Sequence, residues 1–168
     1  MNGILHIDHF IAEPDDLYRS LLCTISWDER MAARKTVSFG KAYNYSQISY
    51  PDAPFLPDLE ALLEPLAAVT GLVANNCLVN YYPDGSSKMG YHADRTDNLE
   101  ASTGIAIVSL GTTRHLKFKH ITDPDLLLDY ALVPGSLIYM TQEIQHSWLH
   151  AIPKADTKEG RISLTFRR

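Results

Sequence analysis

The sequence has few cysteines, no excess of positive charge and no long apolar run. Its two cysteines, Cys23 and Cys77, lie far apart, without CxxC spacing and in apolar surroundings, so we predict two buried thiols. No segment is apolar over enough residues to cross a bilayer, and the first residues lack the basic start of a signal peptide. We therefore expect a cytoplasmic protein that does not use the membrane.

The charge balance limits how the protein could bind nucleic acid. The chain has 20 acidic side chains and 15 Lys and Arg side chains, which gives a formal net charge of -5. This balance argues against a broad electrostatic hold on phosphates but leaves room for a local basic patch. At 168 residues, 45% of them hydrophobic and with no low-complexity tract or internal repeat, the sequence predicts one domain with a sizeable core.

The first half of the chain predicts two amphipathic helices. The segment 14–25 begins with a proline and two acidic residues and then places leucine or isoleucine one turn apart along one face. The segment 56–71 has similar apolar spacing and stops at Gly71, and Pro65 should kink it or divide it in two. Between them, residues 26–56 are aromatic and polar with little periodicity, so we expect loops and hairpins that cover the rest of the protein.

From Cys77 onward the sequence changes to short runs of β-branched and aromatic residues, which are typical of strands. These runs are residues 77–82, 103–111, 115–121, 126–132, 135–140, 148–153 and 161–167. Helices followed by many short strands indicate an α+β fold whose strands form a two-sheet sandwich or jelly roll, with the helices packed outside. Jelly rolls often hold a metal between their two sheets.

A His-x-Asp pair in the stretch GYHADRTD is a candidate for metal binding. In an extended segment His92 and Asp94 face the same side and can converge on one point, although an isolated pair of this kind is more often a surface hydrogen bond. Two histidines and one carboxylate suit non-haem Fe(II), because they leave positions open for a cosubstrate and dioxygen. The third ligand would come from one of four downstream histidines, His115, His120, His146 or His150. The first two flank an alternating strand and should face solvent, and spacing alone does not choose between the other two.

Two predicted strands carry polar side chains on one face. Along RISLTFR, three apolar residues alternate with Arg161, Ser163, Thr165 and Arg167, and along LVNYY the polar Asn80 and Tyr82 share a face. These polar faces could be exposed to solvent, or they could line a pocket in which guanidinium groups bind a dicarboxylate. The strand rise separates the two arginine backbones by about 20 Å, so a pocket requires both side chains to lean inward.

Five segments together resemble a known family. They are NYYPDGSSKMGYHADRTD, IAIVSLGTTRHLKFK, PGSLIYM, WLHAIPK and RISLTFR, and their order and spacing are similar to those of the AlkB-like Fe(II)/2-oxoglutarate dioxygenases over about residues 34–167. The resemblance implies one AlkB-like domain over residues 1–168, in which 77–168 form a double-stranded β-helix (jelly roll) core. Two outer helices would pack on one sheet, and residues 26–56 would form a substrate lid. Fe(II), 2-oxoglutarate and O2 are the implied cofactor and co-substrates.

The resemblance also implies roles for individual residues. His92, Asp94 and His150 would be the iron ligands, and His146 would not be a ligand. The 2-oxoglutarate site would consist of Asn80, Tyr82, Arg161, Ser163 and Arg167. Arg161 would pair with the distal carboxylate and Arg167 would lie near the metal-binding end, while Ser163 stands where many relatives carry asparagine.

Substrate residues are implied by a further segment, ARKTVSFGKAYNYS, which resembles the stretch that leads into the family's lid. It makes Trp27, Arg34, Tyr43 and Tyr45 candidates for the substrate rim, and aromatic packing of a long loop explains them equally well. Thr96 stands where nucleobase-demethylating members commonly carry an acidic residue. Arg114 could contact phosphate or lie inside the pocket, as the equivalent arginine does in many relatives.

The implied function is oxidative demethylation of alkylated nucleobases in DNA or RNA, a form of nucleic acid repair that releases formaldehyde, succinate and CO2. The base would come from a single strand or be flipped out of a duplex, and we expect a monomer. The acidic charge balance and Thr96 favour an alternative, a 2-oxoglutarate-dependent hydroxylase of a small metabolite or a protein side chain. A metal-free binding module on a jelly roll is the non-enzymatic alternative.

Overall fold

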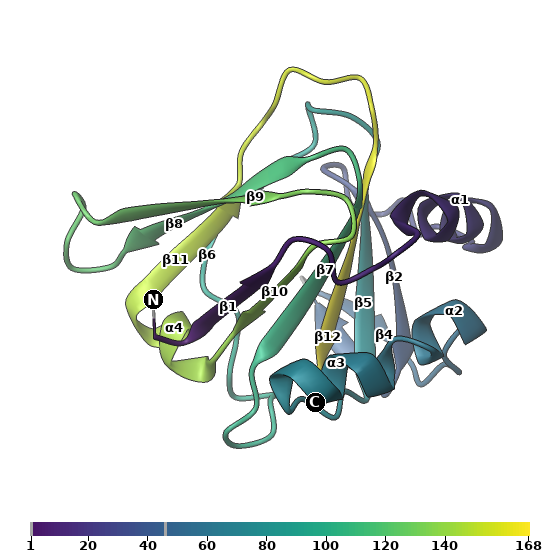
Figure 1. Ribbon diagram of the computed structural model, residues 1–168, viewed down its shortest axis with the longest axis horizontal. Coiled ribbons are helices and arrows are strands. Elements are labelled where there is room, and N and C mark those ends of the chain that lie inside the picture. The colour runs from purple at the N-terminus through teal and green to yellow at the C-terminus, as the bar shows by residue number, and fades with distance from the viewer. Residues whose placement is uncertain (1, 46) are drawn as a thin grey trace.

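The computed structural model describes residues 2–45 and 47–168, apart from the side chain of Tyr45. Its strands form two main antiparallel sheets and a separate hairpin (Figure 1). The six-stranded sheet runs in the order β1 (Ile4–Ile7), β10 (Leu137–Met140), β7 (Ile105–Gly111), β12 (Arg161–Arg167), β5 (Asn76–Tyr82) and β2 (Lys35–Gly40). The four-stranded sheet runs in the order β6 (Met89–His92), β11 (Trp148–Ile152), β8 (Arg114–His120) and β9 (Leu127–Leu132). The hairpin consists of β3 (Tyr43–Tyr45) and β4 (Ile48–Tyr50).

Helices cover one face of the six-stranded sheet. They are α1 (Pro14–Thr24), α2 (Pro57–Glu60) and α3 (Leu63–Thr70) (Figure 1), while α4 (Gln142–Ser147) leads into β11. Leu21, Leu59 and Leu66 on these helices are fully buried in one apolar cluster with Val108 and Leu164 of the sheet. Burial of each leucine contributes about 1.5–3 kcal/mol, so this layer is a main source of stability.

A second apolar cluster fills the space between the two sheets. Ile107 and Ile138 of the six-stranded sheet meet Leu116, Phe118 and Trp148 of the four-stranded sheet there. Successive residues of a strand face opposite sides, so each strand of the larger sheet contributes both to the helix-covered layer and to the layer between the sheets. The polar residues of β12 face the second layer, which places them inside the molecule.

The structure confirms the α+β jelly roll with helices outside one sheet. The seven predicted strands correspond to β5 and to β7 through β12, with ends that differ by no more than two residues. The strands β1, β2 and β6 were not predicted, because β1 and β6 have only four residues each and β2 lies in a segment without clear periodicity. Among the residues described, no helix is long and apolar enough to span a membrane.

Three local predictions are corrected. Residues 35–40, expected to belong to a covering loop, form the edge strand that pairs with β5. The thiol of Cys23 is exposed while that of Cys77 is buried, because Cys23 lies on the side of α1 that faces away from buried Leu21. The second helical segment is divided as predicted, but before Pro65, which occupies the first turn of α3, where its missing N–H leaves no hydrogen bond unmade.

Candidate metal centre and adjoining pockets

Strand pairing between β6 and β11 brings three possible metal ligands together. His92 lies opposite His150 in the register of these strands, and their ring centroids are 4.4 Å apart. Asp94 follows β6, with one carboxylate oxygen 3.3 Å from Nε2 of His150 and the other 3.8 Å from Nε2 of His92. One ligand atom from each residue lies within 4.8 Å of the others. His146 is exposed on α4, so the structure brings His150 to this cluster and leaves His146 outside it.

The protonation states of the cluster suit a cation. His92 donates from Nδ1 to the carbonyl of Gly90 at 2.8 Å, which leaves the Nε2 lone pair free. Burial, together with the nearby His150, lowers the pKa of His92 and favours the neutral ring. Burial by itself would raise the pKa of Asp94, but the hydrogen bond and charge of His150 outweigh it and lower that pKa to about 2. Metal ligands must be a carboxylate and neutral imidazoles, and the shifts of Asp94 and His92 are toward these forms.

Gln145 holds the backbone of Asp94, the candidate carboxylate ligand. The Asp94 N–H donates to Oε1 of Gln145 at 2.9 Å, and the Gln145 side chain is buried in α4. Gln145 was not predicted as a site residue, because the histidines are the recognisable metal-ligand candidates in QEIQHSWLH. The signal comes from the structure: Gln145 is buried, and a buried amide needs hydrogen-bond partners.

An inner pocket extends from the three residues between the two sheets. Its lining is Leu78, Asn80, Tyr82, Met89, His92, Asp94, Ile107, Leu116, Leu132, His150, Ile152, Arg161, Ser163, Thr165 and Arg167. The pairing of β5 with β12 puts Asn80 opposite Ser163 and Tyr82 opposite Arg161. The register therefore gathers all five residues predicted to bind 2-oxoglutarate around the same pocket as the metal cluster.

The two arginines of this pocket are buried without a counter-ion. Arg161 and Arg167 are 1% and 4% exposed, and neither forms an ion pair within the described part of the chain. Arg161 donates from Nη2 to Ser109 Oγ at 2.8 Å, but Nε and Nη1 of both arginines have no hydrogen-bond partner among the described residues. Burial lowers the pKa of Arg161 to about 10, so the guanidinium is still charged at neutral pH. The polar face of β12 is thus a pocket wall rather than a solvent-exposed face, and its free N–H groups fit a small dicarboxylate.

Arg34 orients one of the pocket amides. Its Nε donates to Oδ1 of Asn80 at 2.9 Å, and both side chains are buried. Because the amide oxygen accepts this bond, the NH2 group of Asn80 is the end left for a pocket ligand. The structure therefore places Arg34 behind the inner pocket and not at a solvent-exposed rim.

An outer pocket of about 470 Å³ lies beside the metal cluster. Its lining is Tyr43, Asn44, Gln47, Ile48 and Ser49 from the β3–β4 hairpin, together with His92, Ala93, Asp94 and Arg95. The guanidinium carbon of Arg167 lies 4.1 Å from the centroid of the Tyr43 ring, so this stack stands between the inner and outer pockets. Of the predicted rim residues, Tyr43 lines the pocket, and the side chain of Tyr45 lies outside the described part of the structure.

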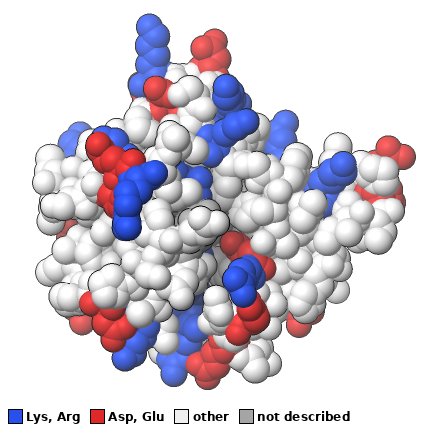
Figure 2. Space-filling model, turned by 180° about the vertical axis from the view of Figure 1, so that it is seen from behind, with Lys and Arg blue, Asp and Glu red and all other residues white. Residues whose placement is uncertain are grey.

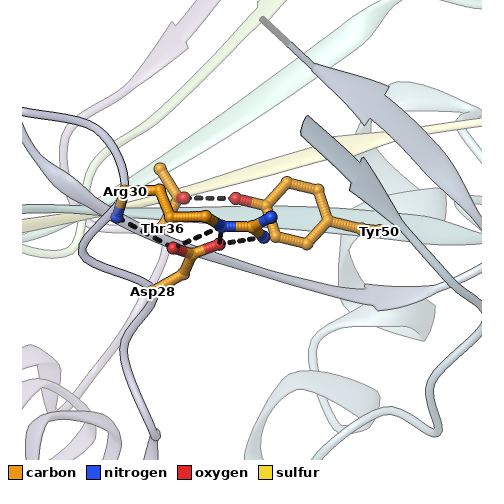
Figure 3. A network of polar contacts seen from close by, with 4 residues as sticks. All are labelled: Asp28, Arg30, Thr36 and Tyr50. Atoms are coloured by element: carbon orange, nitrogen blue, oxygen red, sulfur yellow. Dashed lines mark hydrogen bonds and ion pairs between the residues drawn. The ribbon is translucent and has the colours of Figure 1, made fainter. Parts of the chain in front are cut away.

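Polar contacts fasten the base of this hairpin to β2. Figure 3 shows the hydroxyl of Tyr50, at the end of β4, bonded to the hydroxyl of Thr36 in β2. Beside them, the carboxylate of Asp28 holds the guanidinium of Arg30 and accepts from its backbone N–H. Both Thr36 and Tyr50 are buried. The hairpin is therefore anchored at its open end, while its tip extends over the outer pocket.

Three predicted substrate residues are not among the described residues that line either pocket, although the Arg114 guanidinium lies 5.7 Å from the ring centroid of Tyr82, which lines the inner pocket. Trp27 packs against Tyr81 on the helix-covered side of the sheet, with centroids 5.2 Å apart. The Arg114 guanidinium is occupied by the carbonyls of Asp84, Ser87 and Pro153 at 2.5–3.3 Å. The carbonyl of Thr96 accepts from Leu99 in a turn. Sequence spacing did not reveal which side of the sheet each of these residues would face.

Comparisons with known proteins agree with this geometry. The sequence model of the 2OG-Fe(II) oxygenase superfamily matches residues 19–167. The human protein named DNA oxidative demethylase ALKBH2 is 31% identical over 146 residues, which cover 80% of this chain and 56% of the human protein. The mouse protein of the same name is 32% identical, with 80% of this chain and 61% of the mouse protein covered. The chain thus spans a little over half the length of these relatives.

A solved structure shares the fold. The structure of OsALKBH1 superposes with a TM-score of 0.73 and covers 100% of this chain and 99% of that chain. Its sequence identity is 17%, so it bears on the fold alone. The jelly roll with its helix-covered sheet is accordingly an arrangement that a distant sequence also adopts.

Proposed function

The chain belongs to the 2OG-Fe(II) oxygenase superfamily and is AlkB-like in sequence, and we propose that it oxidatively demethylates alkylated nucleobases of DNA or RNA. The observation that carries the proposal is the convergence of a His-Asp-His cluster and two buried, unpaired guanidinium groups on one pocket. The names of the ALKBH2 relatives support a nucleic acid as substrate.

The residues present fit both groups that the family uses. His92, Asp94 and His150 would hold Fe(II), because they offer two neutral nitrogens and a carboxylate within 4.8 Å of one another. Arg161 and Arg167 would hold the two ends of 2-oxoglutarate, since their free N–H groups lie in the same pocket. When bound, iron and 2-oxoglutarate would allow dioxygen to hydroxylate a C–H bond while 2-oxoglutarate is converted to succinate and CO2, and a hydroxylated N-methyl group leaves as formaldehyde.

The protein's own residues orient these groups and exclude water. Asn80, held by Arg34, presents its NH2 group to the pocket, and Ser163 and Tyr82 add hydroxyl groups. The apolar walls formed by Met89, Leu116 and Ile152 keep the pocket dry, which strengthens its charged interactions. The substrate would enter the outer pocket, where the β3–β4 hairpin serves as a lid and Tyr43 offers an aromatic ring.

An activity screen tests the proposal. Methylated DNA and RNA oligonucleotides and a panel of small metabolites would be offered in parallel with Fe(II) and 2-oxoglutarate, and formaldehyde and succinate would be measured. We expect formaldehyde from the oligonucleotides and none from the Asp94→Ala variant. Turnover of a small metabolite with no release from any oligonucleotide would contradict nucleic acid demethylation and favour the metabolite hydroxylase.

A further inference from the structure

We infer that the outer pocket selects electrically neutral alkylated bases over cationic ones. This inference rests on the proposed function and specifies its substrate class. Some N-methylated bases, such as 3-methylcytosine, carry a positive charge at neutral pH, whereas others of nearly the same shape, such as 3-methyluracil, are neutral. The lining of the pocket distinguishes these two classes by charge.

The wall that the hairpin contributes is uncharged. Residues 43–50 read YNYSQISY and contain no acidic or basic residue. Asn44, Gln47 and Ser49, which carry amides and a hydroxyl, are among the residues that line the pocket. Such groups both donate and accept hydrogen bonds, so they can satisfy the carbonyl and N–H edges of a neutral base. They offer no full negative charge to balance a cation.

The wall opposite the hairpin offers no free carboxylate. Asp94 is the single acidic residue among the described residues that line the pocket, and it belongs to the metal cluster. Asp97, the next acidic residue along the chain, is engaged by Arg95, with Nη2 to Oδ2 at 2.5 Å and Nε to Oδ1 at 3.1 Å. The carboxylate after the ligand is therefore neutralised by its own neighbour.

The charge behind the pocket is positive. In the proposed loaded site, two buried arginines match the two carboxylates of 2-oxoglutarate, and Asp94 cancels one of the two charges of Fe(II). The guanidinium of Arg167 also lies directly against Tyr43 at the border of the two pockets. A cationic base would thus approach a site of the same sign in which Asp94, the one carboxylate of the described lining, is already committed to the metal cluster. This approach is unfavourable in a partly desolvated pocket.

A matched pair of substrates tests the inference. Two single-stranded oligonucleotides of identical sequence would carry one 3-methyluracil or one 3-methylcytosine, and kcat/KM would be measured by mass spectrometry of the product. Binding of the same oligonucleotides to metal-free protein would be measured by fluorescence anisotropy. We expect the methyluracil strand to be favoured about tenfold or more in kcat/KM, equivalent to about 1.4 kcal/mol.

A charge variant of the pocket gives the second arm. Asn44→Asp replaces an amide of the lining with a carboxylate of the same shape, and we expect it to move the methyluracil to methylcytosine ratio about tenfold toward methylcytosine. Asn2→Asp, at an exposed position outside both pockets, adds the same charge and should leave the ratio unchanged.

The possible outcomes separate the two proposals. Equal or reversed preference in an enzyme that turns over either oligonucleotide would overturn the inference alone. An unchanged ratio in Asn44→Asp would also overturn it, because the lining would then not set the preference. Turnover of neither oligonucleotide, nor of any other alkylated strand, would overturn the proposed function and the inference with it.

Discussion

The two histidines of QHSWLH lie four residues apart in different surroundings. His150 is buried in β11 opposite His92, whereas His146 is exposed on α4. We expect His150→Ala to abolish the weak visible charge-transfer band of the anaerobic Fe(II) and 2-oxoglutarate complex, and His146→Ala to leave it. Visible absorption spectroscopy checks both variants, and the opposite pattern would move the third ligand to His146.

Gln145 should control metal affinity without contacting the metal. Gln145→Leu removes the acceptor of the Asp94 N–H, which leaves a donor unpaired at a cost of about 1–3 kcal/mol. Loss of such outer hydrogen bonds typically weakens metal binding by about 10–100-fold, so we expect the Kd for Mn(II), measured by calorimetric titration, to rise by that order.

Gln142 provides the matched control on the same helix. Its amide donates to the backbone carbonyl of Glu100, away from the metal cluster. Gln142→Leu should therefore leave the Mn(II) affinity within about twofold of wild type, which is about 0.4 kcal/mol. Equal loss in both variants would mean that the helix position, and not the bond to Asp94, sets the affinity.

At the residue scale, the sequence predicted the kinds of side chain in the site better than the side of the sheet that each side chain faces. The His-x-Asp pair and the alternating arginines were compatible with a metal site and a dicarboxylate pocket, and the family resemblance made both the expectation. Spacing did not choose between His146 and His150, because that choice depends on the register of β6 against β11. Trp27, a candidate for the substrate rim, packs against Tyr81 on the helix-covered side of the sheet, since the side that a residue faces depends on pairing between distant strands.

At the scale of strands and helices, Gly40 and Gly71 make a matched pair. Both have a left-handed backbone, with φ of +84° and +73°. A Cβ at Gly40 would lie 2.1 Å from the carbonyl oxygen of Asn75, whereas a Cβ at Gly71 would meet nothing within 4 Å. We expect Gly71→Ala to lower the free energy of unfolding by about 1–2 kcal/mol from backbone strain alone.

Gly40→Ala should cost more, roughly 3–5 kcal/mol, because strain and a backbone clash add at the end of β2. Urea unfolding followed by circular dichroism measures both variants. A similar loss in the two would show that the end of β2 and the backbone of Asn75 can move apart without cost.

An aromatic contact joins the hairpin to the inner pocket. Tyr43 is on β3 and its ring stacks on the guanidinium of Arg167 in β12, so the hairpin directly contacts a residue of the predicted 2-oxoglutarate site. Tyr43→Phe keeps the ring over the guanidinium, while Tyr43→Ala removes it. We expect the alanine variant to bind 2-oxoglutarate about fivefold more weakly, near 1 kcal/mol for a cation–π contact, with the phenylalanine variant close to wild type in a calorimetric titration.

Elements were predictable where the local pattern was strong. Seven strands followed from β-branched and aromatic runs, because such residues suit a half-buried pleated surface. Hairpins were expected within residues 26–56, but the position of the hairpin at 43–50 and the edge strand β2 were not predicted, since YNYSQISY mixes polar and aromatic residues without a clean period. The position of the hairpin is therefore defined by tertiary contacts, such as that of Tyr50 with Thr36, rather than by local propensity (Figure 3).

At the scale of the whole molecule, charged side chains of both signs are spread over the surface, and many of the arginines are paired with acidic residues. Figure 2 shows Lys and Arg interspersed with Asp and Glu over the face seen from behind. The exposed arginines Arg19, Arg30, Arg95 and Arg168 each form an ion pair with an acidic residue. With a net charge of -5, the protein should contact few phosphates.

This balance predicts a weak dependence of nucleic acid binding on salt. For a single strand, the slope of log K against log salt concentration is about -0.7 for each phosphate contact, so two or three contacts give a slope of about -2. Fluorescence anisotropy of metal-free protein with a labelled methylated strand, over a series of NaCl concentrations, measures it. Asp97→Asn should release Arg95 from its ion pair and steepen the slope by about 0.7. A wild-type slope near -5 would instead require a continuous row of basic side chains on the protein surface. Contacts to the phosphates of the strand, rather than contacts in the uncharged hairpin pocket, would then dominate binding.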